Sequence, residues 1–332
     1  MGSTLPLTNR RLGVDKFYTQ LSVGIAPDQV LIGDTLFPVL RGDLSRMLIA
    51  KYGVEAWQMI DDAVGDRSMP KRVDIQMGKL SIDIEGHALI NPVSDREQQE
   101  SLKGPAQLDL EKQALYTLKQ RMLLRREFLQ ATLAQNTALY PAGNVITHAA
   151  GATRWDNIAA GVNTADPIAE LVPFIENTIP QQIGRRPNIG WTSSLVWSKI
   201  ITNTIVKQRV FGTANPQGTP TKAQIASLMG LEDILVGYAV TRPEPGDETS
   251  ATTPIWGKSF GVAYVPPVAG TQIPAFGYTA EQRVFGDAAE AVVRIRNEYM
   301  GPSGGWDLKR SAFYSPVMTF PTAGTIFTTV VS

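Results

Sequence analysis

The sequence predicts an α+β fold, and three observations support that class. Residues 73–77 and 80–84 each alternate apolar and polar side chains, which is typical of a β-ribbon with one buried face. Residues 108–136 contain neither glycine nor proline and could form one helix of about 40 Å. From residue 166 onward, strand-like and helix-like segments interleave without the regular βαβ rhythm of a parallel sheet.

Composition narrows the class of protein. The 332 residues suffice for one large domain or two ordinary ones, and 31 basic residues balance 31 acidic ones. No net positive field therefore draws the whole chain to nucleic acid or to a membrane surface. The absence of cysteine excludes disulfides and thiolate sites and fits a reducing cytoplasm. No run of 18 apolar residues predicts a membrane span, and the N-terminus lacks the apolar core of a signal peptide.

Residues 1–36 are rich in turn-forming residues, and their apolar side chains are too scattered for a compact domain. We predict an extended arm with one short helix near Asp15–Ser22. Residues 43–53, DLSRMLIAKYG, fit a strand and a helix equally well.

The predicted ribbon has one apolar face. It consists of Val73, Ile75, Met77, Leu80, Ile82 and Ile84. A turn at Gly78–Lys79 would make the ribbon a hairpin. Because two strands alone are marginally stable in water, the ribbon must lie on something, in its own chain or in a neighbouring one.

The long helix can begin at Gln107 or Asp109, whose charge suits the positive end of the helix dipole. Two adjacent apolar stripes follow it. They are Leu115, Leu118, Met122, Leu129 and Leu133, and Leu110, Ala114, Leu124, Phe128 and Ala131. Arg121, Arg125 and Arg126 lie largely between or beyond the stripes. The stripes do not keep strict heptads for long enough to favour a coiled coil.

The second half of the chain contains further helix signals. Asp166 can cap a helix whose first residue is Pro167, and Pro173 predicts a kink within it. The segment TKAQIASLMG predicts a short helix that ends at Gly230, and EDILVGYAVT predicts a buried strand.

A search for catalytic chemistry finds little. His87 and His148 have no histidine partner at helical spacing, and the adjacent Asp61 and Asp62 are typical of a solvated turn. GxSxG, GxxxxGK[ST] and a GxGxxG that follows a strand are all missing from the sequence. We therefore expect no enzyme, no metal and no cofactor, and instead a binding or structural protein.

The order of arm, ribbon, long helix and compact α+β remainder resembles the major capsid proteins of tailed bacteriophages with the Hong Kong 97-type fold, which encapsulin shells share. Local patterns in the second half carry the resemblance: a PN loop, a short helix whose glycine leads to a VLVG-like strand, an IWG strand and a P-x-FGY segment. The matching residues are Pro187, Asn188, Gly230, Val236, Gly237, Ile255, Trp256, Gly257, Pro274, Phe276, Gly277 and Tyr278.

The resemblance implies a division of the chain. It consists of an N-terminal arm at 1–36, an extended loop at 37–92, a peripheral domain at 93–180 and 283–332 with its spine helix at 106–137, and an axial domain at 181–282. The ribbon residues would contact a neighbouring subunit, and Arg121, Arg125 and Arg126 would face the lumen or DNA. Some relatives crosslink a lysine of the extended loop, but no motif singles out Lys51, Lys71 or Lys79.

The function that the resemblance implies is that of a coat protein. Such a chain self-assembles through pentamers and hexamers into an icosahedral shell that encloses double-stranded DNA without sequence specificity. The expected partners are further copies of the chain and separate scaffold, portal and decoration proteins, with no membrane. The expected location is the virion, with assembly in the bacterial host cytoplasm. The alternatives are an encapsulin-like nanocompartment shell and another virion structural protein.

Overall fold

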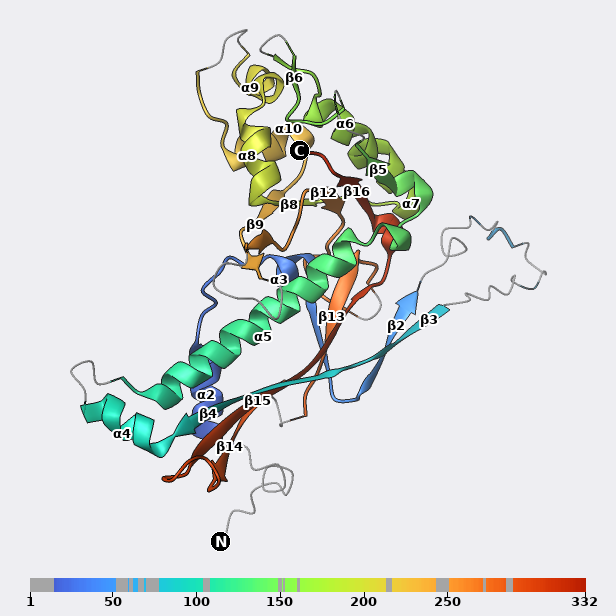
Figure 1. Ribbon diagram of the computed structural model, residues 1–332. Helices are drawn as coiled ribbons and strands as arrows, with labels where there is room; N and C mark the ends of the chain where they lie inside the picture. Colours follow the sequence, from blue (N-terminus) through green and yellow to red (C-terminus); the bar gives the residue numbers. More distant parts are fainter. Residues whose placement is uncertain are drawn as a thin grey trace.

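The computed structural model describes residues 15–51, 59, 62–64, 69, 78–103, 108–148, 151, 153–159, 162–212, 217–242, 251–270, 273–284 and 289–332. Val73, Ile75 and Met77 of the predicted ribbon, Lys71 and the first 14 residues lie outside these described ranges. Figure 1 shows an elongated molecule with a lower and an upper part. The lower part contains a long helix that lies along a sheet, and in the upper part short helices surround a second sheet.

The lower part is built around the long helix α5, with the sheet on one side of it (Figure 1). Its helices are α2 (Lys16–Gly24), α3 (Gly33–Leu36), α4 (Asp95–Lys103) and α5 (Leu110–Gln135). Its strands are β1 (Val39–Gly42), β2 (Arg46–Lys51), β3 (Gly78–Asp83), β4 (Gly86–Ser94), β13 (Gly277–Gln282), β14 (Glu290–Asn297) and β15 (Gly305–Met318).

The upper part is formed by elements between residues 137 and 263, joined by residues 321–328 near the C-terminal end. Its helices are α6 (Pro167–Pro173), α7 (Ile179–Ile183), α8 (Ser194–Thr202), α9 (Thr204–Phe211) and α10 (Lys222–Met229), with a π-helical turn at Phe174–Thr178 and 3-10 turns at Thr137–Leu139, Ala142–Asn144 and Pro321–Ala323. Its strands are β5 (Val145–Thr147), β6 (Ile158–Ala159), β7 (Val162–Asn163), β8 (Ile189–Ser193), β9 (Asp233–Gly237), β10 (Val240–Thr241), β11 (Thr253–Pro254), β12 (Phe260–Ala263) and β16 (Gly324–Thr328).

Two main sheets organise the molecule. The lower sheet has the order β1-β13-β15-β14, and β4 also pairs with β15. The upper sheet has the order β5-β16-β12-β8-β9. This mixture of parallel and antiparallel pairs confirms the predicted α+β class. None of the described helices combines the length and the apolar character that crossing a bilayer requires.

Helix ends lie where capping residues predict them. Asp15 caps α2 and Asp109 caps α5, in each case by accepting a hydrogen bond from a backbone N–H of the first turn. Asp166 caps α6, and Pro173 is followed by the π-helical turn, which confirms the predicted irregularity. α10 ends at Gly230, whose φ of 73° is the left-handed conformation of a helix stop.

The predicted hairpin turn at Gly78–Lys79 is wrong. Both residues lie within β3, where Gly78 pairs with Lys51 and Lys79 pairs with Ala50 of β2. The ribbon is therefore formed by β2 and β3, and the ambiguous segment RMLIAK is one of its strands. Gly-Lys is only a weak turn signal, and pairing with a strand earlier in the chain overrides it.

One face of the described ribbon rests on its own subunit. Met47, Ile49 and Ile82 pack with Leu40 and Tyr278 in a small apolar cluster. Leu80 and Ile84 pack against the same cluster. The opposite face is open, because Leu48 is 54% exposed and Leu44, before β2, is 74% exposed.

β4 pairs with β15 along its whole length, from Gly86 opposite Phe313 to Ser94 opposite Gly305. The segment following the ribbon thus joins the lower sheet. The division into arm, extended loop, peripheral and axial domains stays a prediction.

The upper core explains why glycine occupies positions 237 and 261. Trp191 and Trp256 are fully buried and lie 5.3 Å apart between ring centroids. A Cβ at Gly237 would lie 2.2 Å from Trp256 Cδ1, and one at Gly261 would lie 2.3 Å from Trp191 Cε2. Only glycine lets these strands approach the two indoles so closely.

Candidate functional site

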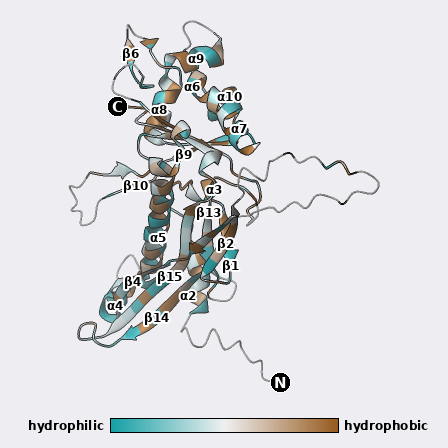
Figure 2. Ribbon diagram, turned by 90° about the vertical axis from the view of Figure 1, so that its right-hand side faces the viewer, coloured by the Kyte–Doolittle hydropathy of each residue, from teal (hydrophilic) through white to brown (hydrophobic). Residues whose placement is uncertain are grey.

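The buried side of α5 combines apolar side chains with several polar ones. Met122, Leu115 and Leu118 are buried as the apolar stripes predict, but Phe128 is 37% exposed. The buried polar side chains of α5 are Glu111, Lys119, Arg126, Glu127 and Gln130. In Figure 2 the strands of the lower sheet are more hydrophobic in colour than the neighbouring α5. Because buried polar groups need partners, these side chains show what the helix holds together.

Two polar side chains of α5 hold the N-terminal segment at residues 22–28 through its backbone. Lys119 Nζ donates hydrogen bonds to the carbonyl oxygens of Ser22 at 2.7 Å and Val23 at 2.9 Å. Gln120 donates to the carbonyl oxygen of Ala26 at 2.7 Å and accepts from the Asp28 N–H at 2.9 Å. Residues 22–28 therefore lie along α5 without burying large apolar side chains.

Glu127 joins three segments at one carboxylate. Its Oε1 accepts from the Ile32 N–H at 2.9 Å and from Trp256 Nε1 at 2.7 Å. Its Oε2 accepts from the Gly33 N–H at 2.8 Å. Burial raises the pKa of Glu127, against the opposing effect of the three donors. The carboxylate thus ties the N-terminal segment and the upper part to the middle of α5.

The C-terminal end of α5 continues this attachment. Gln130 Nε2 donates to Asp34 Oδ1 at 2.7 Å and to Thr279 Oγ1 at 2.9 Å. Gln135 Nε2 donates to the carbonyl oxygen of Ile255 at 2.9 Å. A Cβ at Gly33 would lie 2.0 Å from Gln130 Oε1, so a side chain here would displace the Gln130 carboxamide from its hydrogen bonds.

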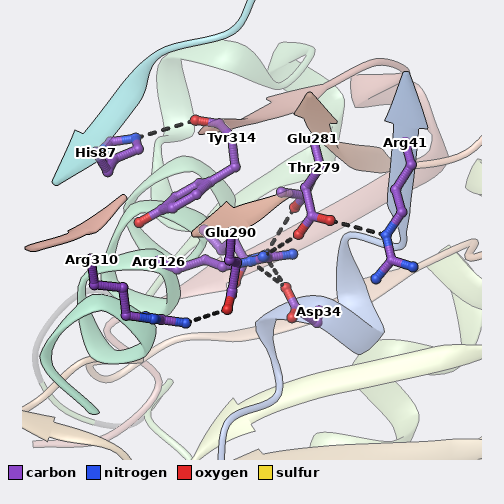
Figure 3. Close-up of polar contacts among 10 residues, drawn as sticks. Asp34, Arg41, His87, Arg126, Thr279, Glu281, Glu290, Arg310 and Tyr314 are labelled. Carbon is purple, nitrogen blue, oxygen red and sulfur yellow. Dashed lines mark hydrogen bonds and ion pairs between the residues drawn. The ribbon is translucent and has the colours of Figure 1, made fainter. Parts of the chain in front are cut away.

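Arg126 is the buried centre of an ion-pair cluster, which Figure 3 shows. Its Nη1 donates to Glu281 Oε1 of β13 at 2.5 Å, and its Nε lies 2.8 Å from Asp34 Oδ1. Arg41 Nε donates to the second oxygen of Glu281 at 3.2 Å. On the far side Arg310 of β15 pairs with Glu290 of β14 at 2.5 Å. The cluster links α5 to the strands of the lower sheet.

The three arginines that the sequence singled out therefore differ. Arg126 is only 8% exposed, which leaves no face to offer to DNA. Arg121 and Arg125 are exposed, and the Arg125 guanidinium carbon lies 5.5 Å from the centroid of the Phe128 ring. The prediction that basic side chains of α5 face DNA therefore remains for Arg121 and Arg125 only.

The histidines have ordinary partners. The His87 ring stacks on Tyr314 with 4.2 Å between centroids. His148 Nε2 lies 2.8 Å from Glu170 Oε1, and the other oxygen of Glu170 accepts from Trp155 Nε1 at 2.8 Å. Within the described residues, no group of three or more His, Cys, Asp or Glu side chains is arranged to hold a metal ion.

Sequence reasoning missed most of this site. The available signal was the spacing of polar residues on α5, which includes intervals of three, seven and eight residues. These residues are Lys119, Gln120, Glu127 and Gln130. Their partners lie 92 to 149 positions away in the chain, so the sequence alone did not reveal them.

The chain is similar in sequence to two curated phage proteins, both named major capsid protein. No family model matches the chain. The major capsid protein of Burkholderia phage BcepMu is 28% identical over 276 residues, which are 81% of this chain and 84% of that protein. The major capsid protein of Pseudomonas phage JBD67 is 23% identical over 331 residues, which are 98% of this chain and the whole of that protein.

Solved structures share the fold over nearly the whole chain. A phage-related protein from Bordetella bronchiseptica RB50 has a TM-score of 0.72 at 22% identity, covering 96% of this chain and 97% of that chain. The capsid of cyanophage P-SCSP1u has a TM-score of 0.60 at 13% identity, covering 98% of both chains. Both sequence relatives are phage proteins, which favours a phage shell over the encapsulin alternative. The chain therefore has the fold of these phage structures, which is the Hong Kong 97-type fold that the sequence resemblance predicts.

Proposed function

We propose that this chain assembles through pentamers and hexamers into the icosahedral shell that encloses phage double-stranded DNA. The observation that carries the proposal is the likeness to two phage major capsid proteins, one of them along 98% of this chain. The shell is part of the virion, and its assembly takes place in the host cytoplasm. The role is structural rather than catalytic, and the partners are other copies and separate scaffold, portal and decoration proteins.

The physical character of the subunit suits tiling. A shell repeats each contact many times, so modest interfaces add up to a stable particle. The balance of 31 basic against 31 acidic residues limits repulsion between copies. The hydrogen bonds of Glu127 and Gln135 join α5 to the upper part. They favour an elongated subunit that behaves as one rigid body.

The ribbon is the element that we propose to contact a neighbouring subunit. The inner face of its described portion is already covered by its own chain, since Ile82 is 5% exposed. The contact therefore uses the outer face with Leu44 and Leu48, together with residues 52–77. Val73, Ile75 and Met77 belong to that segment and keep their proposed role.

Shortening the ribbon tests the proposal and leaves the described strands β2 and β3 in place. Lys51 and Gly78 lie directly opposite each other, so an Asn-Gly turn can replace residues 52–77 and close a two-residue hairpin. We expect this variant to keep its unfolding midpoint but to form no shells by negative-stain electron microscopy, whereas the unaltered chain forms them. Closed shells from the shortened variant would show that the ribbon is not required for assembly.

Arg121 and Arg125 are proposed to face packaged DNA. Removing one arginine that binds a phosphate should make the plot of log binding constant against log salt less steep by about 0.9. We expect a double change, Arg121→Gln with Arg125→Gln, to reduce the salt dependence of DNA binding by unassembled subunits accordingly. Arg96→Gln, at an exposed arginine of α4, is the control and should leave the slope unchanged. Equal slopes for all three proteins would contradict the assignment.

A further inference from the structure

A small cavity lies between α5 and the lower sheet, beside the buried ion pairs. Its volume is about 10 Å³, and Arg126, Arg310, Glu281, Glu290 and Tyr314 contribute to its walls. Figure 3 shows the Tyr314 ring next to Arg126, with the Arg310–Glu290 pair nearby. This volume corresponds to about one water-sized sphere.

Two buried side chains present polar atoms without a partner here. Arg126 Nη2 and Tyr314 Oη have no hydrogen-bond partner among the residues that the structure describes. Arg126 is 8% exposed and Tyr314 is 3% exposed, so bulk water does not satisfy these atoms. Buried polar groups in native proteins almost always have a partner, which is protein or an ordered water.

We propose that the cavity binds a single ordered water molecule that bridges α5 and β15. The water accepts a hydrogen bond from Arg126 Nη2, shares a second with Tyr314 Oη and donates to the carboxylate of Glu281 or Glu290. It thereby has the two to four polar partners that a buried water requires. The site lies within one subunit and is independent of the proposed assembly.

Charge and size both favour water over a halide ion. Three positive groups, Arg41, Arg126 and Arg310, are matched in this cluster by Asp34, Glu281 and Glu290. An added anion would leave the buried cluster with a net negative charge, which is costly in a poorly solvated place. A chloride ion is also larger than the space that one water fills.

The direction in which a mutation of Tyr314 changes the folding equilibrium constant tests the proposed water bridge. If water joins Tyr314 Oη to Arg126, Tyr314→Phe removes a hydrogen bond and should lower the folding equilibrium constant about three- to tenfold. If the hydroxyl is truly unpaired, the same change removes an unsatisfied group and should raise that constant. Tyr140→Phe calibrates the assay, because Tyr140 Oη donates directly to the carbonyl oxygen of Ala134 at 2.6 Å and its removal should be destabilising.

A density map that resolves ordered water provides the second test. We expect a peak about 2.5–3.2 Å from both Arg126 Nη2 and Tyr314 Oη. The proposal would be overturned by an empty cavity in such a map, by a stabilising Tyr314→Phe change, or by an anomalous signal at the site after chloride is replaced with bromide.

Discussion

Replacing Glu127 with alanine is expected to lower the free energy of unfolding by about 3–5 kcal/mol. The change leaves three donors without their acceptor: the backbone N–H groups of Ile32 and Gly33 and the indole N–H of Trp256. Each buried donor left unpaired costs about 1–3 kcal/mol. Because domains are typically stable by only about 5–15 kcal/mol, this single change would remove much of the margin. Urea unfolding followed by tryptophan fluorescence measures it.

Two further variants make the Glu127 result specific. Glu127→Gln keeps the shape, but its NH2 group must face a donor, so we expect this variant to be destabilised as well. Gln113→Ala, at an exposed position on the same helix, should change the stability little. A Glu127→Gln variant as stable as the unaltered chain would show that the three hydrogen bonds do not hold these segments together.

Replacing Arg126 with alanine is expected to lower the free energy of unfolding by about 3–5 kcal/mol, because it leaves the buried carboxylate of Glu281 without its main partner. Arg41 remains beside Glu281, but its own side chain is 59% exposed, so solvent weakens that pair. The neighbouring Arg125→Ala is the matched control, since Arg125 is exposed and lies on the same turn of α5. Urea unfolding of the three proteins measures the difference.

A double variant separates charge from packing in this cluster. Replacing Arg126 and Glu281 together with methionine removes both buried charges while filling the space, and such exchanges are often neutral or stabilising. We therefore expect the double variant to be more stable than Arg126→Ala. If both proteins are equally destabilised, impaired packing rather than an unpaired charge is the cause.

Local signals predicted the frame of the fold well. Asp109 and Asp166 begin helices, and Gly230 ends one, because a cap depends on residues only a few positions apart. The length of α5 followed from the lack of glycine and proline between residues 108 and 136. Its interpretation as a structural spine came from the family resemblance.

Long-range pairing could not be predicted in the same way. The alternation of Leu80, Ile82 and Ile84 correctly indicated an extended strand, but nothing near it identified β2 as its partner. The residues on α5 that bind the rest of the chain are charged or amide side chains. A helix pattern normally assigns these to solvent, as we did for Arg126. Their burial depends on Glu281, Trp256 and the backbone of residues 22–33, which only the folded chain brings together.

The central claim is that this chain builds a closed shell, and cryo-electron microscopy of the full-length chain expressed in bacteria tests it most directly. We predict closed particles whose reconstruction shows pentamers and hexamers of the elongated subunit, with the ribbon of each copy lying over its neighbour. Monodisperse single subunits at every concentration and in the presence of the phage's other structural proteins would contradict the account.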